Sequence, residues 1–377
     1  MAARRAYFTR IRLRCLAEVL AVSLGVPGAA QTTDEARPSV VLESKTASVR
    51  VDLGGGSISD FHLAGDNHNP LTWDSARSGV SPRPMGHFLC LDRWGPPSQA
   101  EERHGMPFHG EASRVRWRVV AGPHVKSGHV EAEMAAVLPM AGLQVTRLIR
   151  LSGDAALFTV TERVTNTNQL GRIYNMVQHP TIAPPFLDEH TLVDSNGTRG
   201  FMQSSPLPDP ERIAVSWPYA VENGVKVDVR RLTSDPAPNV VSYTIDEEYG
   251  WTTATSASQR LLIGYIWKNS DYPWFNAWRH AERGVPVARG LEFGTTGLHQ
   301  PFPVLVSKGR IFDRSLYAYL DAGETAARAY AGFLFRVPAN YQGVANISYV
   351  NGQLRLHEHG GRSDRTLTMT VGALFGE

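Results

Sequence analysis

Cysteine is scarce in this sequence: only 2 occur among 377 residues, which excludes a fold stabilised by many disulfides. Cys15 lies in a leader-like segment, so Cys90 would remain alone after export and no intrachain disulfide could form. The sequence also lacks a large excess of charge of either sign. The formal net charge is +2, but residues 1–30 hold five arginines and one glutamate, leaving 33 basic and 35 acidic residues beyond them. A nucleic-acid partner is therefore not expected.

Long apolar runs and familiar catalytic signatures are also lacking. Beyond the leader, no segment approaches the ~18 uninterrupted apolar residues of a membrane span, so none is expected in the mature chain. The sequence has no Gly-x-Ser-x-Gly elbow and no His-Glu-x-x-His pair, and its run Gly54-Gly55-Gly56 precedes a strand-like segment rather than a helix. We expect no metal and no cofactor.

The leader has the pattern of an export signal. Its arginine-rich start is followed by an apolar run from Leu16 to Val26 and by the small residues Gly28-Ala29-Ala30. Residues 1–30 are therefore predicted to direct export, to the periplasm or the extracellular space. The pair Arg4-Arg5 points to the twin-arginine route. An N-terminal amphipathic helix is the alternative interpretation.

Residues 31–377 show the two-residue alternation of β-strands and little helical periodicity. This pattern predicts an all-β fold, a large antiparallel β-sandwich with few short helices, formed as a single domain over residues 31–377. Two consecutive β domains are the alternative. The clearest expected strands are 49–53, 115–119, 143–151, 158–164, 261–267 and 366–371.

Two further segments give specific local expectations. Asn351-Gly352 lies between the strand-like runs 348–350 and 353–356, which predicts a hairpin with a type I′ turn. The alanine-rich segment Glu324–Phe335 is compatible with a helix or with one arm of a hairpin.

Three polar clusters are candidates for chemistry, at residues 104–111, 174–180 and 289–300, together with an aromatic stretch at 272–280. Glu292 lies between Leu291 and Phe293, which indicates a strand whose carboxyl group points toward a groove. The aromatic stretch fits either core packing or a platform for sugars, since a flat ring matches the C–H face of a pyranose.

The order of these clusters resembles the aldose 1-epimerase (galactose mutarotase-like) superfamily. Residues Gly86–Gly95 followed by His109-Gly110 are similar to its glucose-6-phosphate 1-epimerase branch. The segment Asn175 to His179 resembles the one that carries the family's general acid, and Leu291-Glu292 resembles the strand that carries its general base. The resemblance spans about residues 44–373 and implies the mutarotase sandwich fold.

The resemblance also implies roles. His179 is the expected general acid at the ring oxygen of an aldose, and Glu292 the general base at its C1 hydroxyl, so that ring opening and closure interconvert the α and β anomers. His109 is expected to bind a sugar hydroxyl or to assist at the ring oxygen. Arg93 and Trp278 are further expected sugar contacts.

The expected partner is therefore a monosaccharide or the end of a glycan. A rival hypothesis retains the sandwich and the aromatic side chains but not the acid–base pair. It describes an exported, non-catalytic carbohydrate-binding protein. The sequence does not specify the sugar or the oligomeric state.

Overall fold

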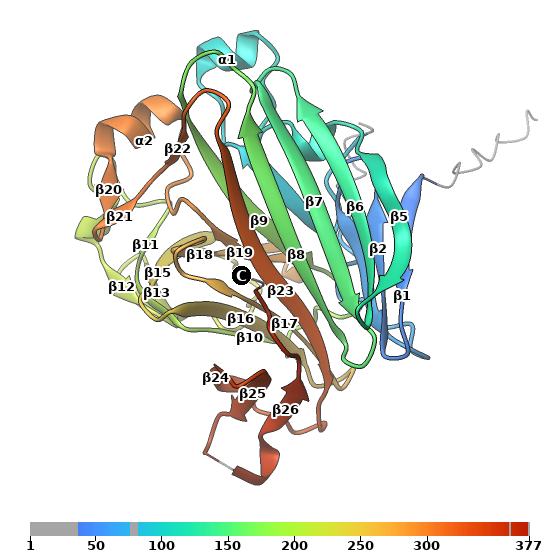
Figure 1. Ribbon diagram of the computed structural model, residues 1–377. Coiled ribbons are helices and arrows are strands. Elements are labelled where there is room, and N and C mark those ends of the chain that lie inside the picture. Colours follow the sequence, from blue (N-terminus) through green and yellow to red (C-terminus); the bar gives the residue numbers. More distant parts are fainter. Residues whose placement is uncertain (1–36, 76–81, 362, 376–377) are drawn as a thin grey trace, which may run out of the picture. The chain divides into compact units, whose positions relative to one another are not determined.

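The structure is a computed structural model that describes residues 37–75, 82–361 and 363–375 (Figure 1). The predicted leader at residues 1–30 lies outside the described residues, so the division of the chain at residue 30 stays a prediction. Among the described residues, no helix has the length and apolar character needed to cross a membrane.

Two large antiparallel sheets make up most of the fold. The first has 11 strands in the order β1-β2-β3-β4-β9-β19-β18-β15-β11-β12, with β22 paired to β9. Its strands are β1 Ser39–Glu43, β2 Ala47–Asp52, β3 Ile58–Leu63, β4 His87–Asp92, β9 Arg172–Ile182, β11 Gly197–Met202, β12 Val215–Ser216, β15 Val240–Ile245, β18 Trp274–Glu282, β19 Val285–Gly294 and β22 Ala318–Leu320.

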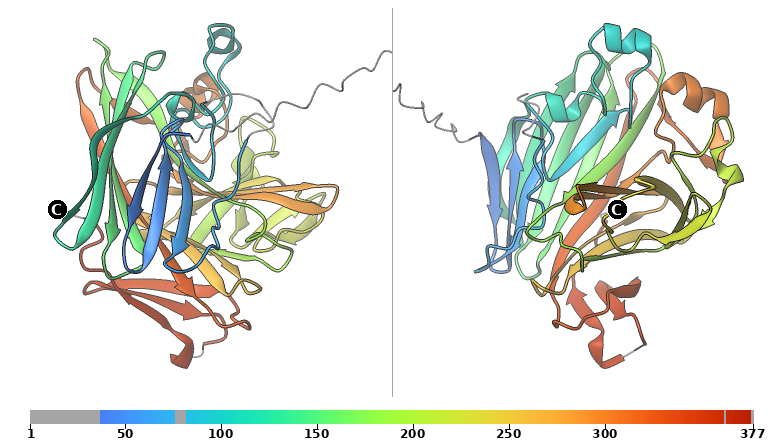
Figure 2. Two further views of the ribbon diagram at one scale, coloured as in Figure 1. Left: turned by 90° about the vertical axis from the view of Figure 1, so that its right-hand side faces the viewer. Right: turned by 180° about the vertical axis from the view of Figure 1, so that it is seen from behind.

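The second large sheet has 8 strands in the order β10-β16-β17-β23-β8-β7-β6-β5. Its strands are β5 Arg118–Lys126, β6 His129–Leu138, β7 Leu143–Ser152, β8 Leu157–Asn166, β10 Leu192–Ser195, β16 Tyr249–Ser256, β17 Leu261–Lys268 and β23 Thr325–Arg336. Figure 2 shows the blue strands β1 to β3 of the first sheet lying against the green strands of the second.

Smaller elements complete the fold. The short strands are β13 Tyr219–Glu222, β14 Val225–Asp228, β20 Arg310–Ile311, β21 Arg314–Ser315, β24 Val344–Val350, β25 Gln353–Glu358 and β26 Leu367–Thr370. The helices are α1 Gln99–Arg103, α2 Phe302–Lys308 and the single 3-10 turns Ala112–Arg114, Pro210–Arg212 and Ser363–Arg365. The predicted fold class, an antiparallel β-sandwich with few short helices, is confirmed.

The main core lies between the two large sheets. β7 alternates buried and partly exposed residues along its whole length, as its sequence predicts for a strand with one face in the core. β17 is buried on both faces, because one face packs into the main core and the other meets the sheet β24-β25-β26. The continuous apolar run of β17 therefore follows from its position between two layers.

Three local predictions are decided by the structure. Asn351 and Gly352 both have positive φ angles, of 51° and 72°, which confirms the predicted hairpin turn. The segment Glu324–Phe335 is not helical, since β23 occupies it. The predicted strand at 115–119 is wrong in its bounds: β5 begins at Arg118, while buried Trp117 donates to the Ala112 carbonyl.

A buried ion pair of the second sheet is hydrogen-bonded to the first sheet. The Arg147 Nε donates to the Glu162 Oε1 at 2.6 Å, and Gln178 of β9 donates to the Glu162 Oε2 at 2.6 Å. The two charged side chains are 1% and 0% exposed, so removal of either leaves the other charge without its partner in the core.

We expect Arg147→Met to lower the free energy of unfolding by about 3–5 kcal/mol, because Glu162 would lose its buried cation. The matched control is Lys45→Met, which removes an ion pair to Asp154 whose side chains are 85% and 88% exposed. This control should cost at most about 1 kcal/mol. Urea denaturation of both variants measures the difference, and equal losses would contradict the role of the buried pair.

Candidate active site

A row of side chains crosses the centre of the first sheet. The register pairs Phe88 of β4 with His179 of β9. It also pairs Gly290 of β19 with Thr181 and Phe293 with Gln178, which places Glu292 across from His179. Opposite residues on neighbouring strands share a face, so His179 and Glu292 project from the sheet side by side.

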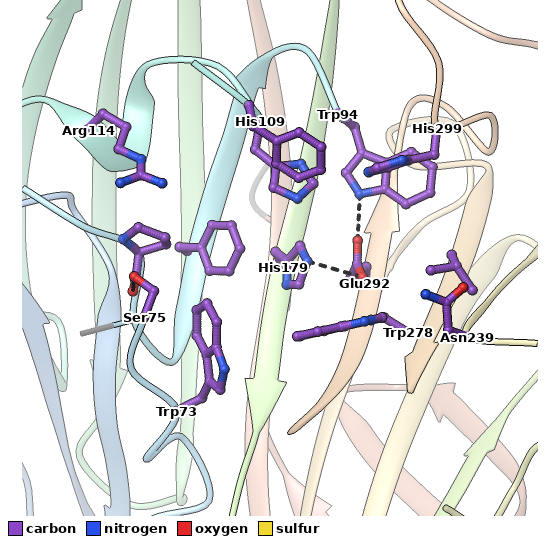
Figure 3. A pocket seen from close by; sticks show the side chains of 14 residues that line it. Trp73, Ser75, Trp94, His109, Arg114, His179, Asn239, Trp278, Glu292 and His299 are labelled. Carbon is purple, nitrogen blue, oxygen red and sulfur yellow. Dashed lines mark hydrogen bonds and ion pairs between the residues drawn. The ribbon is translucent and has the colours of Figure 1, made fainter. Parts of the chain in front are cut away.

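Direct contacts join the members of this row (Figure 3). The His179 Nε2 lies 3.2 Å from the Glu292 Oε1, and the Trp94 indole N–H donates to the Glu292 Oε2 at 2.6 Å. The His179 Nδ1 lies 2.9 Å from the Thr181 hydroxyl, and the Phe88 ring stacks on the imidazole with 4.2 Å between centroids. Both ring nitrogens of His179 thus have a partner, which fixes the orientation of the ring.

Gly290 leaves the space that the Glu292 carboxyl group occupies. A Cβ atom at position 290 would lie 2.7 Å from the Glu292 Oε1 and 3.0 Å from the Trp278 Cβ. Residues 290 and 292 lie on the same face of β19, so the carboxyl group folds back over the bare backbone of Gly290.

Burial favours the neutral forms of this pair. It raises the pKa of Glu292 well above its usual range, against the opposing effect of the Trp94 hydrogen bond. Burial also lowers the pKa of His179 to about 3. Burial therefore favours a protonated carboxyl group beside a neutral imidazole, an arrangement with one proton on the pair.

The pair forms part of a pocket of about 400 Å³, within the size range of small-molecule sites. Aromatic side chains dominate it: Trp73 stacks near Phe88, and Trp278 lies 5.8 Å from His179 between ring centroids. The described residues that line it are Trp73, Ser75, Pro84, Phe88, Trp94, Phe108, His109, Arg114, His179, Asn239, Val240, Trp278, Glu292 and His299.

Two further histidines lie in the pocket wall. The His109 Nδ1 accepts from the Gly95 N–H at 3.1 Å, so its other ring nitrogen carries the proton of the neutral ring. His109 has a φ angle of +66°, a conformation rare for a residue with a side chain, and its backbone N–H donates to the Gly95 carbonyl at 3.0 Å. His299 lies 5.5 Å from His109 between ring centroids, and burial lowers its pKa to about 4.

Arg114 and Asn239 lie at opposite ends of the pocket, with His179 and Glu292 between them (Figure 3). Arg114 ends the 3-10 turn Ala112–Arg114, which lies between α1 and β5, and is partly buried. Within the part of the chain that the structure describes, its side chain has no ion pair or hydrogen bond, and burial lowers the pKa of its guanidinium.

The structure brings together four of the five predicted site residues: His179, Glu292, His109 and Trp278 all line the pocket. Arg93 lies outside it. The Arg93 guanidinium binds Asp92 at 2.7 Å and Glu101 at 2.8 Å, and we do not retain Arg93 as a sugar contact.

Several pocket residues received no role from the sequence. His299 lies in the polar cluster at 289–300 and Trp94 in the segment Gly86–Gly95, but nothing in these patterns showed that their ring centroids lie 4.6 Å apart. Trp73 and Arg114 lie in loops without a motif. Among the described residues, no group of three His, Cys, Asp or Glu side chains is placed to hold a metal ion.

Comparison with known proteins places the fold. No family model and no curated protein matches the sequence. Solved structures do match. A galactose mutarotase related enzyme from Lactobacillus acidophilus has a TM-score of 0.57 and 12% identity, covering 80% of this chain and 98% of that one.

Two other structures agree. A galactose mutarotase-like protein from Lactobacillus casei ATCC 334 has a TM-score of 0.55 and 14% identity, covering 79% of this chain and all (100%) of that one. Another, from Clostridium acetobutylicum, has a TM-score of 0.55 and 13% identity, covering 79% and 95%. The chain therefore has the galactose mutarotase-like sandwich fold, and at these identities the likeness is one of fold.

Proposed function

We propose that this protein is an aldose 1-epimerase-like isomerase that interconverts the α and β anomers of a sugar. The observation that carries the proposal is the contact of His179 with Glu292 in a pocket walled by aromatic rings. An imidazole and a carboxyl group that share one proton are the two groups that opening of a sugar ring requires. The fold of the solved neighbours supports the same reaction class.

In the proposed mechanism, the proton of Glu292 first moves along the 3.2 Å contact to His179. The resulting imidazolium protonates the ring oxygen as the bond from C1 to that oxygen breaks, and the carboxylate takes the proton of the C1 hydroxyl. The aldehyde then rotates about the C1–C2 bond. Ring closure on the other face returns both protons in reverse, so the pair ends with the one proton it started with.

The other pocket residues have supporting roles in this proposal. The Trp278 ring offers a flat apolar face to the sugar, and the protonated ring nitrogen of His109 donates to a hydroxyl or to the ring oxygen. The Trp94 N–H stabilises the carboxylate form of Glu292 after the proton has moved. The leader sequence leads us to propose that the reaction takes place outside the cytoplasm, in the periplasm or the extracellular space.

Polarimetry tests the proposal directly. The optical rotation of freshly dissolved α-glucose, α-galactose, α-xylose and α-arabinose should change spontaneously toward its equilibrium value, and the protein should accelerate this change for at least one of them. Titration calorimetry on the same sugars is the companion measurement. Binding without acceleration across this panel and across the corresponding uronates, D-glucuronate and D-galacturonate, would overturn the isomerase and favour the non-catalytic carbohydrate-binding protein.

A further inference from the structure

Arg114 is the unexplained charge of the pocket. Among the described residues that line it, Arg114 and Glu292 are the only Arg, Lys, Asp or Glu side chains. Glu292 is engaged by His179 and Trp94, whereas no carboxylate in the described part of the chain pairs with Arg114. A partly buried guanidinium without an acidic partner is costly, and a ligand that brings a negative charge removes this cost.

The field of Arg114 acts inside the pocket. Burial is the main cause of the lowered pKa of His109, and the positive charge of the Arg114 guanidinium lowers that pKa further. The walls between Arg114 and the pair are largely aromatic, and charges interact more strongly beside such walls than in water.

We propose that the substrate is a sugar acid, a hexuronate whose carboxylate binds Arg114 while C1 and the ring oxygen face His179 and Glu292. This inference rests on the proposed function for the position of the ring. A carboxylate fits better than a phosphate because Arg114 is a single cation. Among the described lining residues no lysine or second arginine is present to balance a dianion.

Equilibrium binding tests this selectivity without relying on catalysis. Titration calorimetry compares D-galacturonate with D-galactose, and D-glucuronate with D-glucose. We expect the wild-type protein to bind each uronate about 10- to 100-fold more tightly than its neutral partner, the range for a hydrogen bond between charged groups. Raising the salt concentration should reduce this ratio.

The variant Arg114→Met should bring the uronate-to-aldose affinity ratio close to one. A ratio does not depend on how much of the variant is folded. The matched control is Arg116→Met, because Arg116 is exposed two residues further along the chain and does not line the pocket. This control should keep the wild-type ratio.

Three outcomes would overturn the inference: a wild-type ratio near one, an unchanged ratio in Arg114→Met, or tighter binding of glucose 6-phosphate than of glucuronate. Polarimetry of the same compounds separates this inference from the proposed function. Preferred binding of uronates without faster loss of rotation removes the isomerase and keeps the sugar-acid site. Faster mutarotation together with a uronate-to-aldose affinity ratio near one keeps the isomerase and removes the sugar-acid site.

Discussion

Glu292→Gln is expected to lower kcat/KM for mutarotation by about 10²- to 10⁴-fold, the contribution of a positioned acid–base group. Glutamine has nearly the same shape, its amide oxygen can still accept from the Trp94 N–H, and its NH2 group can still reach His179. The variant therefore keeps the contacts of the site but cannot exchange a proton. Polarimetry on the fastest sugar of the panel measures the loss.

Glu247→Gln is the matched control for this variant. Glu247 is exposed and lies outside the pocket, so its substitution should leave kcat/KM within about 2-fold. Thermal unfolding of both variants checks that the fold is intact. A Glu292→Gln protein with near wild-type activity would remove Glu292 from the mechanism.

His179→Asn is expected to cause a loss of about 10²- to 10⁴-fold as well, for the complementary reason. Asparagine can replace the contact of the His179 Nδ1 with Thr181, but its side chain is too short to replace the 3.2 Å contact with Glu292. The exposed His190, whose side chain is 73% exposed, supplies the control His190→Asn. Full activity in His179→Asn would exclude this imidazole as a proton carrier.

The pH dependence of wild-type activity tests the lowered pKa of His179. The pair is active while it holds one proton. With the pKa of His179 at about 3, a second proton binds only near that pH, so activity is lost as the pH falls through about 3 rather than through about 6.5. The raised pKa of Glu292 keeps the first proton in place above pH 4.5. A wild-type acid limb near pH 6.5 would contradict the neutral resting pair.

The fold class followed from local patterns in the sequence, whereas the pairing of His179 with Glu292 was implied by the resemblance to a family. Alternation identified one-sided strands such as β7, and the apolar neighbours of Glu292 indicated a carboxyl group directed out of a strand. The position of Glu292 directly opposite His179 does not follow from a local pattern. It depends on which strands pair, and β9 and β19 are far apart along the chain.

Contacts between distant loops could not be predicted. Trp94 and Glu292 are separated by 198 positions, and no spacing rule connects them. For the same reason, the sequence pointed to Arg93 as a sugar contact instead of its neighbour Trp94. β4 ends at Asp92 and the chain bends at Trp94, and it is the Trp94 side chain that lines the pocket while Arg93 binds Asp92 and Glu101. Arg114 has no motif around it, so only the three-dimensional arrangement marks it.

The row Phe88, His179 and Glu292 has a consequence for redesign. These residues belong to three adjacent strands whose hydrogen-bonded ladder fixes their spacing, whereas Trp73, Arg114 and Asn239 come from the connections around them. Exchange of those connections should retune which molecules are accepted while the proton-handling centre keeps its geometry. The sheet is thus a rigid scaffold for the three residues, and directed evolution of this protein would be best confined to its loops.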